Sequence, residues 1–230
     1  MKTVLVSPML SNECKRSLEG LGLCVREIPP YEKLSGSVST HPDMLFFPLP
    51  DGSVRVGEEY YNENREFFAS LDVRVEKDPV SPRSPYPLDV RFDVLALKGS
   101  LYGKAGSVSE KILCRYEKFT SVKQGYARCS VAVISENAVI TADPTLALAL
   151  ESDSIRVLKI KSGHIALAGF DCGFIGGAGG SLGDNLYCFF GDVSTHPDGE
   201  GIIKFMAENG ITAVMLSGEP LSDHGGLLLI

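Results

Sequence analysis

The stretch SVAVISENAVITADPTLALALESDSIRVLKI, residues 130–160, contains one complete copy of the pattern from which the whole chain is built. Two short apolar segments typical of β-strands are followed by a longer run typical of a helix. Asp143 stands just before that run, where its side chain would cap the first helical turn. The predicted elements are two strands, a helix and a third strand: Ser130–Ile134, Ala138–Thr141, Pro144–Leu150 and Ile155–Ile160.

The same order of elements recurs, with variations, five times along the 230 residues. The helices begin roughly 35 to 55 residues apart, which indicates a structural repeat rather than a tight sequence repeat. A periodic α/β chain of this kind is expected to form a propeller-like ring with its chemistry at the axis. Other predicted elements are the helices Ser11–Leu21, Glu58–Ser70, Ser107–Arg115 and Asp198–Asn209, the last with Gly210 as its C-cap, and a strand over Asp43–Pro48.

The two ends of the chain complement each other. The first unit begins with a predicted strand over Met1–Val6 and is one strand short, whereas the chain ends in the apolar stretch GLLLI, Gly226–Ile230. We therefore predict a single α/β domain over residues 1–230, a five-unit propeller closed by its C-terminal strand. The proline-rich segment Asp78–Pro87 is a candidate domain boundary, and we interpret it as a surface crossing between two units.

Composition limits the partners. The net charge is −7 and the basic residues form no cluster, which argues against binding to nucleic acid. The sequence has neither a membrane-spanning apolar stretch nor a signal peptide, so we expect a cytoplasmic protein without membrane contact. The cysteines are scattered without CxxC spacing, so we expect mostly buried thiols, no metal and no cofactor. They are Cys14, Cys24, Cys114, Cys129, Cys172 and Cys188.

Glycine is concentrated in GFDCGFIGGAGGSLGDNLYCFFGDVSTHP, Gly169–Pro197, where it stands beside Asp171, Cys172 and Cys188. Such a loop either cradles a ligand or crosses tightly over the end of a sheet, and both interpretations stay open. A phosphate site is disfavoured because no P-loop lysine follows the glycines and the next segment is typical of a strand.

The pentapeptide STHPD occurs twice, at residues 39–43 and 194–198. The first copy precedes a predicted strand and the second a predicted helix, and turn formation alone would explain both. The functional alternative is that His41 and His196, each with an aspartate two residues later, face one shared cavity as general acid/base or metal-binding groups. The candidate ligand-binding residues are Asp43, Asp171, Asp198, Asp223 and His224.

Three segments resemble an uncharacterised bacterial family with the guanidine-group-modifying enzyme fold, also called the pentein fold. They are CSVAVISENAVITADP (Cys129–Pro144), GFDCGFIGGAGG (Gly169–Gly180) and PLSDHGGLLLI (Pro220–Ile230). The resemblance implies a five-unit ring. It also implies the chemistry of arginine deiminases, dimethylarginine hydrolases and amidinotransferases, which use a late cysteine nucleophile, a histidine acid/base and carboxylates that grip the guanidinium.

The sequence departs from that pattern at the nucleophile. The pentein hydrolases have their cysteine shortly after a glycine-rich turn, whereas this chain continues from Gly225 and Gly226 to Ile230 and has no cysteine there. An isoleucine forms no covalent thiouronium intermediate. The usual mechanism would therefore need Cys188 or Cys172 as a substitute nucleophile.

Three hypotheses follow. The first, which we favour, is a pentein-fold protein that binds a small polar or guanidine-like ligand in the axial cavity without cysteine chemistry. The second is a hydrolase of non-peptide C–N bonds that uses Cys188 or Cys172 with His196 or His41 as catalytic residues. The third is a structural or interaction scaffold. The sequence leaves the oligomeric state and the identity of the ligand open.

Overall fold

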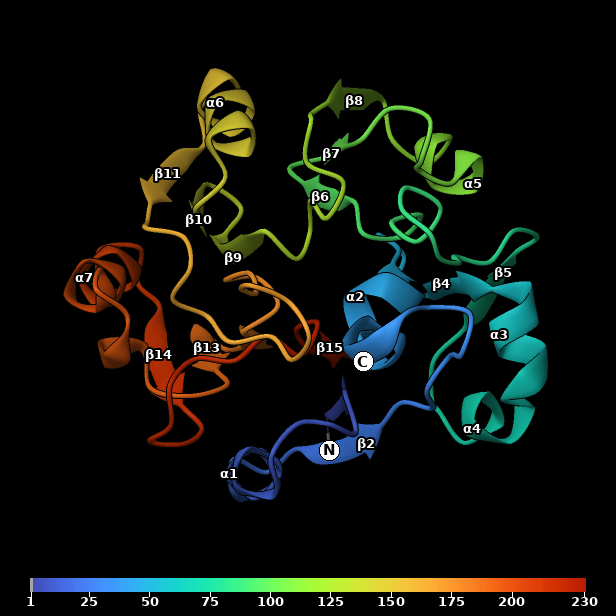
Figure 1. Ribbon diagram of the computed structural model, residues 1–230, viewed down its shortest axis with the longest axis horizontal. Helices are drawn as coiled ribbons and strands as arrows, with labels where there is room; N and C mark the ends of the chain where they lie inside the picture. Colours follow the sequence, from blue (N-terminus) through green and yellow to red (C-terminus); the bar gives the residue numbers. More distant parts are fainter. Residues whose placement is uncertain (1) are drawn as a thin grey trace.

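A computed structural model describes residues 2–230; Met1, which begins the first predicted strand, lies outside the described residues. Within them, fifteen strands form five three-stranded sheets arranged around a common centre (Figure 1). The sheets are β15 (Leu228–Leu229), β1 (Thr3–Val6) and β2 (Cys24–Glu27); β3 (Phe46–Pro48), β4 (Val54–Gly57) and β5 (Val75–Asp78); β6 (Leu95–Leu97), β7 (Ser100–Gly103) and β8 (Lys118–Ser121); β9 (Val131–Ser135), β10 (Ala138–Thr141) and β11 (Arg156–Lys159); and β12 (Gly179–Gly183), β13 (Leu186–Phe189) and β14 (Thr212–Met215).

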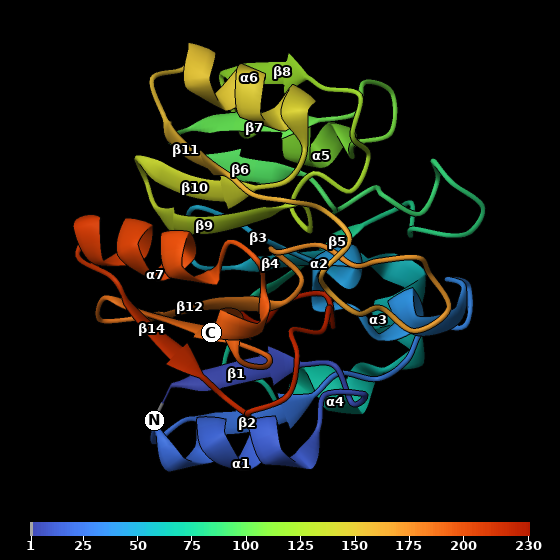
Figure 2. The same cartoon turned by 60° about the vertical axis from the view of Figure 1, so that its left-hand side comes forward.

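Every sheet is built in the same way. Its first strand pairs antiparallel with the central strand, and a helical connection leads from the central strand to a third strand that pairs parallel with it. The helices of these connections lie on the outside of the ring in Figure 1, and Figure 2 shows the sheets from the side. They are α1 (Asn12–Gly20), α3 (Glu58–Glu63) with α4 (Arg65–Ala69), α5 (Glu110–Leu113), α6 (Pro144–Ser152) and α7 (Gly199–Glu208).

The unit over residues 130–160 forms β9, β10, α6 and β11, as the sequence predicts. One carboxylate oxygen of Asp143 accepts hydrogen bonds at 2.8 Å from the backbone N–H groups of Thr145 and Leu146, which confirms Asp143 as the N-cap of α6. Capping satisfies two N–H groups that have no partner inside the helix. Local hydrogen bonding and apolar periodicity therefore specify this unit together.

The C-terminal strand pairs with the N-terminal one. In β15, Leu228 and Leu229 lie opposite Leu5 and Val4 of β1, and the backbones of Thr3 and Ile230 exchange two further hydrogen bonds. The prediction that the tail supplies the strand missing from the first unit is therefore confirmed. Two segments more than 200 residues apart complete one sheet, so both ends of the chain are held by the same pairing.

The apolar core consists of five clusters, each lying between two neighbouring sheets. The contacts run from the first sheet to the second, on to the third, fourth and fifth, and back to the first, so they close the ring. Each cluster has buried members from both sheets: Leu5 and Phe46, Phe47 and Leu101, Leu95 and Val139, Ile140 and Phe189, and Val4 and Cys188.

The structure corrects several predicted elements. The strand predicted over Asp43–Pro48 is a short helix, α2 (Pro42–Leu45), followed by β3, because Pro42 has the fixed φ angle that suits a first helical position. The strands β7 and β12 are not among the predicted elements, since glycine and serine interrupt their apolar pattern. The helix predicted over Glu58–Ser70 is divided at Asn64 into α3 and α4.

Smaller differences between prediction and structure concern the end of helix α7 and the burial of the cysteines. Helix α7 ends at Glu208 with Asn209 as its C-cap, and Gly210, predicted as the cap, follows with a φ of +73°. Only three of the six cysteines are buried, Cys14, Cys129 and Cys188, so the expectation of mostly buried thiols is wrong. No helix among residues 2–230 has the length and apolar character needed to span a membrane.

Candidate ligand site at the ring axis

Five buried side chains meet near the centre of the ring, and we call them the axial cluster. They are His41, Asp43, Asp93, Cys129 and Asp223, each between 1% and 4% exposed. Each lies in the segment that leads into the first strand of a sheet, ahead of β3, β6, β9 or β15. Because the five units are arranged around one axis, equivalent positions of different units converge there. The fold repeat therefore brings distant parts of the sequence together.

His41 and Asp43 are positioned by the first STHPD copy. A 3-10 helix, η1 (Gly36–Thr40), ends at His41, which is also the N-cap residue of α2, and Asp43 lies in the first turn of α2. His41 Nδ1 is 3.9 Å from Asp43 Oδ1 and 3.9 Å from Asp223 Oδ1. The imidazole therefore lies between two carboxylates.

The loop before β15 packs directly against this histidine. Gly225 has a φ of +73°, and a Cβ atom there would lie 2.4 Å from the Cβ of His41. Its carbonyl oxygen accepts a hydrogen bond from the backbone N–H of Asp43 at 3.1 Å. Glycine is therefore required at this position both by the backbone conformation and by the close approach.

Asp223 is well supplied with hydrogen bonds. Its Oδ2 accepts from the backbone N–H of Phe174 at 2.8 Å and its Oδ1 from that of Gly225 at 2.9 Å. The thiol of Cys129 lies 3.4 Å from Oδ2 and donates to it. Burial raises the pKa of Asp223, and the nearby imidazole of His41 opposes that effect.

The carboxylates of Asp93 and Asp43 accept fewer hydrogen bonds than that of Asp223. Oδ1 of Asp93 accepts hydrogen bonds from the backbone N–H groups of Arg128 and Cys129 at 2.7 and 3.0 Å. Oδ2 of Asp93 and both carboxylate oxygens of Asp43 have no hydrogen-bond partner in the described chain. Burial, followed by the charge of Asp43, raises the pKa of Asp93. Burial raises the pKa of Cys129 as well, and the charge of Asp223 adds to this effect.

Two cavities flank the axial cluster. The axial cavity has a volume of about 230 Å³, and Asp43, Arg128 and Tyr187 line it together with glycines of the Gly-rich loop and of the loop before β15. The aromatic cavity has a volume of about 130 Å³ and is lined by His41, Cys129, Asp223, Cys172, Phe170 and Phe174, among others. Polar groups of one cluster thus border both cavities.

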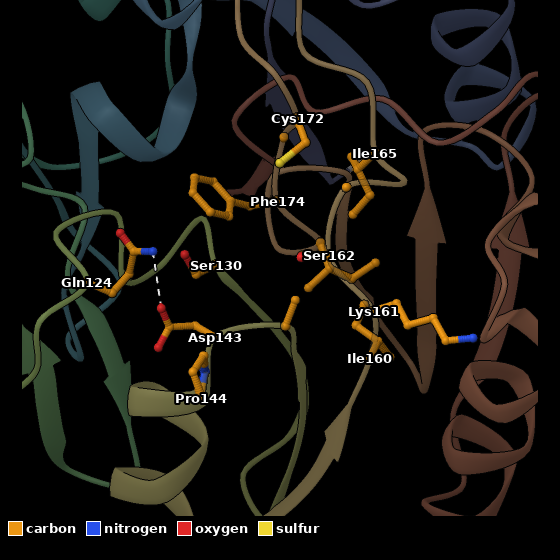
Figure 3. Close-up of a pocket in the computed structure, with 14 residues that line it drawn as sticks. Gln124, Ser130, Asp143, Pro144, Ile160, Lys161, Ser162, Ile165, Cys172 and Phe174 are labelled. Atoms are coloured by element: carbon orange, nitrogen blue, oxygen red, sulfur yellow. Dashed lines mark hydrogen bonds between the residues drawn. The ribbon is translucent and has the colours of Figure 1, made fainter.

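A third cavity, the lateral cavity, lies where β9 begins and β10 ends, beside the segment 160–175, and has a volume of about 160 Å³ (Figure 3). Its walls are mainly apolar, and Cys172 and Phe174 border both this cavity and the aromatic cavity. Gln124 donates a hydrogen bond to Asp143 across one side at 3.3 Å. The axial carboxylates do not line this cavity.

The structure brings together only some of the residues that the sequence predicts. His41, Asp43 and Asp223 lie in the axial cluster, and Cys172 lines the aromatic cavity beside them. Asp171 is exposed in the segment before β12. His224 is half-buried, accepts from or donates to Ser222 Oγ at 3.0 Å, and has its pKa lowered to about 4 by burial.

His196 and Cys188 lie apart from this cluster. His196 Nε2 is 3.1 Å from the carbonyl oxygen of Lys161, and its Nδ1 accepts from the backbone N–H of Asp198 at 3.0 Å. His196 does not line the aromatic cavity that His41 borders. The two STHPD copies are locally alike, because each begins inside a 3-10 helix and leads into an α-helix. The strand predicted to begin at Asp43, in the first copy, begins only at Phe46. Cys188 is fully buried between the first and fifth sheets, where burial raises its pKa to about 12.

Sequence reasoning missed Asp93 as a site residue and placed Cys129 among ordinary thiols. Each stands two residues before the first strand of its unit, Asp93 before β6 and Cys129 before β9. This shared position, two residues before the first strand of a unit, is the one sequence feature from which both residues could have been identified. It could be used only by aligning the first strands of the different units with one another.

The closed ring of five ββαβ sheets with polar groups at its axis defines a protein of the pentein fold, as the sequence resemblance implies. More specifically, the chain belongs to the family of unknown function DUF6873, whose family model matches residues 5–228. No curated protein matches the chain in sequence.

Solved structures share this fold at low sequence identity. Dimethylarginine dimethylaminohydrolase from Pseudomonas aeruginosa, complexed with citrulline, is 8% identical, with a TM-score of 0.55 over 94% of this chain and 92% of that chain. Inosamine-phosphate amidinotransferase from Streptomyces griseus is 12% identical, with a TM-score of 0.54 over 99% and 93%. Agmatine deiminase from C. jejuni is 7% identical, with a TM-score of 0.51 over 94% and 86%.

Proposed function

We propose that this protein binds a small guanidine-like or related organic cation in the axial cavity, without using a terminal cysteine as nucleophile. The observation that carries the proposal is Asp43, a buried residue that lines the axial cavity and whose two carboxylate oxygens have no hydrogen-bond partner in residues 2–230. A buried carboxylate without partners is costly, so a cationic ligand there would recover a large free energy.

Charge and shape both favour a planar cation. Asp43 and Asp223 each lie 3.9 Å from Nδ1 of His41, and the charge of Asp43 acts on Asp93, so the cluster has three carboxyl groups and one imidazole. A guanidinium offers two parallel N–H groups to the two oxygens of one carboxylate, which is the geometry that the free Asp43 carboxylate accepts. The second free acceptor, Oδ2 of Asp93, would take a further N–H.

Arg128 limits the kind of ligand. Its side chain also lines the axial cavity, where one guanidinium nitrogen, Nη1, donates to the carbonyl oxygen of Phe46 at 3.0 Å. An acidic and a basic side chain on the wall of one cavity suit a ligand that carries both a cation and an anion. We therefore expect arginine, which has a carboxylate, to bind more tightly than agmatine, which lacks one.

The last strand has a structural role in this proposal. Ile230 pairs through its backbone with Thr3 and packs beside the apolar cluster between the first and second sheets. It has no nucleophilic group. The role of this segment in our proposal is to close the ring and to hold the loop of Asp223 and Gly225 against His41.

Isothermal titration calorimetry with arginine, agmatine and guanidinium, in buffer with EDTA, tests the proposal. We expect saturable one-to-one binding of at least one compound, weakened tenfold or more in Asp43→Asn. Asp184→Asn is the control for net charge, because Asp184 is exposed and pairs with Lys2. Absence of heat with every compound in a folded sample, or equal affinity in wild type and Asp43→Asn, would reject it.

Hydrolysis of a non-peptide C–N bond is a second candidate, because the aromatic cavity brings Cys129 and Cys172 to the same wall region as His41 and Asp223. A thiol nucleophile needs a lowered pKa, whereas the pKa of Cys129 is raised. An assay for ammonia or urea release separates the two functions. If ammonia or urea release is lost in Cys172→Ala or Cys129→Ala, hydrolysis by a cysteine is favoured. If neither substitution changes the release, a cysteine-dependent hydrolase is rejected.

A further inference from the structure

Three different metal-binding atoms approach one another in the axial cluster. Nδ1 or Nε2 of His41, a carboxylate oxygen of Asp43 and Sγ of Cys129 all lie within 4.8 Å of one another, and all three side chains are buried. In a tetrahedral zinc site, metal–ligand bonds of roughly 2.0 to 2.3 Å place neighbouring ligand atoms roughly 3.3 to 3.8 Å apart. Side-chain adjustments of about an ångström would therefore bring the three atoms to one ion.

The lack of hydrogen-bond partners at the carboxylate of Asp43 is a second, independent observation that points to a bound cation. An acidic group packed for structural reasons would have its oxygens satisfied, as those of Asp223 are. Both oxygens of Asp43 have no partner among the described residues, and Oδ1 faces His41 Nδ1 at 3.9 Å. A cation bound between Asp43 and His41 would satisfy one or both of these oxygens.

We propose that His41, Asp43 and Cys129 form a binding site for a divalent transition-metal ion of the zinc class. A thiolate, an imidazole and a carboxylate together suit Zn²⁺ or Co²⁺, whereas Mg²⁺ and Ca²⁺ prefer sites made of oxygen alone. On binding, the S–H bond of Cys129 breaks and a metal–sulfur bond forms. The released proton passes to solvent, with the carboxylate of Asp223, 3.4 Å from Sγ, as its first acceptor.

The surroundings of the three ligands fit such a site. Asp223 lies 3.9 Å from His41 Nδ1, and both of its oxygens accept hydrogen bonds from backbone N–H groups. It would therefore be a negative charge next to the site and not a fourth ligand of the ion. Three protein ligands leave one coordination position for water or a substrate. The ion would lie between the axial and aromatic cavities, because Asp43 lines the first and His41 and Cys129 line the second.

Cobalt titration tests the site. The full-length protein is stripped with EDTA, freed of chelator and titrated with Co²⁺ in the absence of guanidine compounds. We expect one ion per chain, a thiolate-to-cobalt charge-transfer band in the near ultraviolet and visible bands of tetrahedral intensity, all removed by one equivalent of Zn²⁺. Cys129→Ser should lose the charge-transfer band and Asp43→Asn should bind Co²⁺ at least tenfold more weakly.

Cys172→Ser is the matched control, because Cys172 lines the same aromatic cavity but is not one of the three ligands. Its band should be unchanged. A folded wild type without a thiolate band, or a band that survives in Cys129→Ser, would overturn the proposal. If Cys129→Ser does not fold, Asp43→Asn decides, and an unchanged cobalt affinity in that variant would overturn it.

The inference does not depend on the organic ligand. Calorimetry in EDTA tests guanidine binding without metal, and cobalt titration tests the metal without guanidine. Either proposal can therefore fail while the other holds.

Discussion

Oδ1 of Asp43 lies 3.9 Å from Nδ1 of His41, and the backbone N–H of Asp43 donates to Gly225, yet neither carboxylate oxygen of Asp43 accepts a hydrogen bond from residues 2–230. The backbone of Asp43 is thus fixed by a hydrogen bond, while its carboxylate accepts none. Such a group lowers stability in the absence of a ligand, which is typical of positions kept for binding.

Asp43→Asn is expected to stabilise the ligand-free protein. The amide removes one negative charge beside Asp93 and Asp223, and its NH₂ group can donate to a neighbouring carboxylate. We expect about 1 kcal/mol of added stability, which raises the melting temperature by about 2 to 4 °C in a chain of this size. Thermal unfolding in EDTA measures it.

Asp223→Asn is the contrasting substitution, because the carboxylate of Asp223 is as buried as that of Asp43 but accepts hydrogen bonds. Its two oxygens accept the N–H groups of Phe174 and Gly225, so an amide would turn one acceptor into a donor that faces a donor. We expect a loss of about 1 to 3 kcal/mol. If the two variants shifted the melting temperature in the same direction, the distinction between an unpaired and a paired carboxylate would be wrong.

Gly177→Ala should destabilise the axial cluster. A Cβ atom at residue 177 would lie 1.9 Å from Asp223 Oδ1 and 2.7 Å from Cys129 Sγ, and neither side chain has room to move in the core. We expect a loss of more than about 2 kcal/mol, measured by urea unfolding. Gly201→Ala in α7 is the control, because nothing lies within 4 Å of the added methyl and alanine favours helix, so its stability should rise.

The closing strand can be tested by truncation. Deleting Leu227–Ile230 removes the pairing with β1 and exposes apolar surface in two core clusters. Burial of a large aliphatic side chain is worth about 1.5 to 3 kcal/mol, so the deletion should lower the melting temperature by more than about 10 °C. Leu228→Ala should cost about 2 to 5 kcal/mol, whereas Leu148→Ala, at a residue that is 63% exposed, should cost less than about 0.5 kcal/mol. Unchanged melting of the truncated chain would contradict the closure of the ring.

The repeat and its closure could be predicted because they rest on local signals. Apolar segments and the Asp143 cap specify the fourth unit, and the bare apolar tail needs a partner strand. The strands β7 and β12 could not be predicted in the same way, because Ser-Leu-Tyr-Gly and Gly-Gly-Ser-Leu-Gly carry little β-pattern by themselves. Pairing with a central strand makes these segments extended, and that is a tertiary effect.

The site was predictable only in part, for a similar reason. His41 and Asp43 stand in a repeated pentapeptide and Asp223 beside a histidine, so residue type alone made them candidates. Asp93 and Cys129 become functional candidates through convergence at the axis, which no local pattern encodes. His196 has the same neighbours in sequence as His41, but it follows the central strand β13 of its unit, whereas His41 precedes the first strand β3 of its own. The sequence identity of the two pentapeptides therefore did not imply a shared site.

The buried imidazole of His196 should make the stability of the protein depend on pH. Its Nε2–H donates to the Lys161 carbonyl and its Nδ1 accepts from Asp198 N–H, so the buried ring is satisfied only when neutral. Burial lowers its pKa below 6.5; the Lys161 carbonyl and Asp198 oppose this, whereas His164 and the Lys161 charge add to it. The unfolded chain therefore binds more protons below pH 6.5, and stability present above that pH is lost as the pH falls.

Urea unfolding between about pH 7.5 and about pH 5 measures this effect. His196→Asn keeps an oxygen near the Nδ1 position but has no proton to take up, so the variant should lose a smaller part of its stability over that range. His224, whose pKa is lowered to about 4, contributes in the same direction in both proteins and cancels in the comparison. An identical pH dependence in wild type and variant would exclude His196 as a source.

The two proposed ligands make a joint prediction, because both would use the unpaired charge of Asp43. If a zinc-class ion is bound by His41, Asp43 and Cys129, one carboxylate oxygen is no longer free for bidentate pairing with a guanidinium, and the positive charge of the ion opposes a second cation. We therefore expect one equivalent of Zn²⁺ to weaken arginine binding at least tenfold in calorimetry and EDTA to restore it. In Cys129→Ser, where the metal is held less tightly, the same amount of Zn²⁺ should weaken arginine binding far less. Arginine binding that is equally strong with and without bound Zn²⁺ would mean that the two cations do not share Asp43.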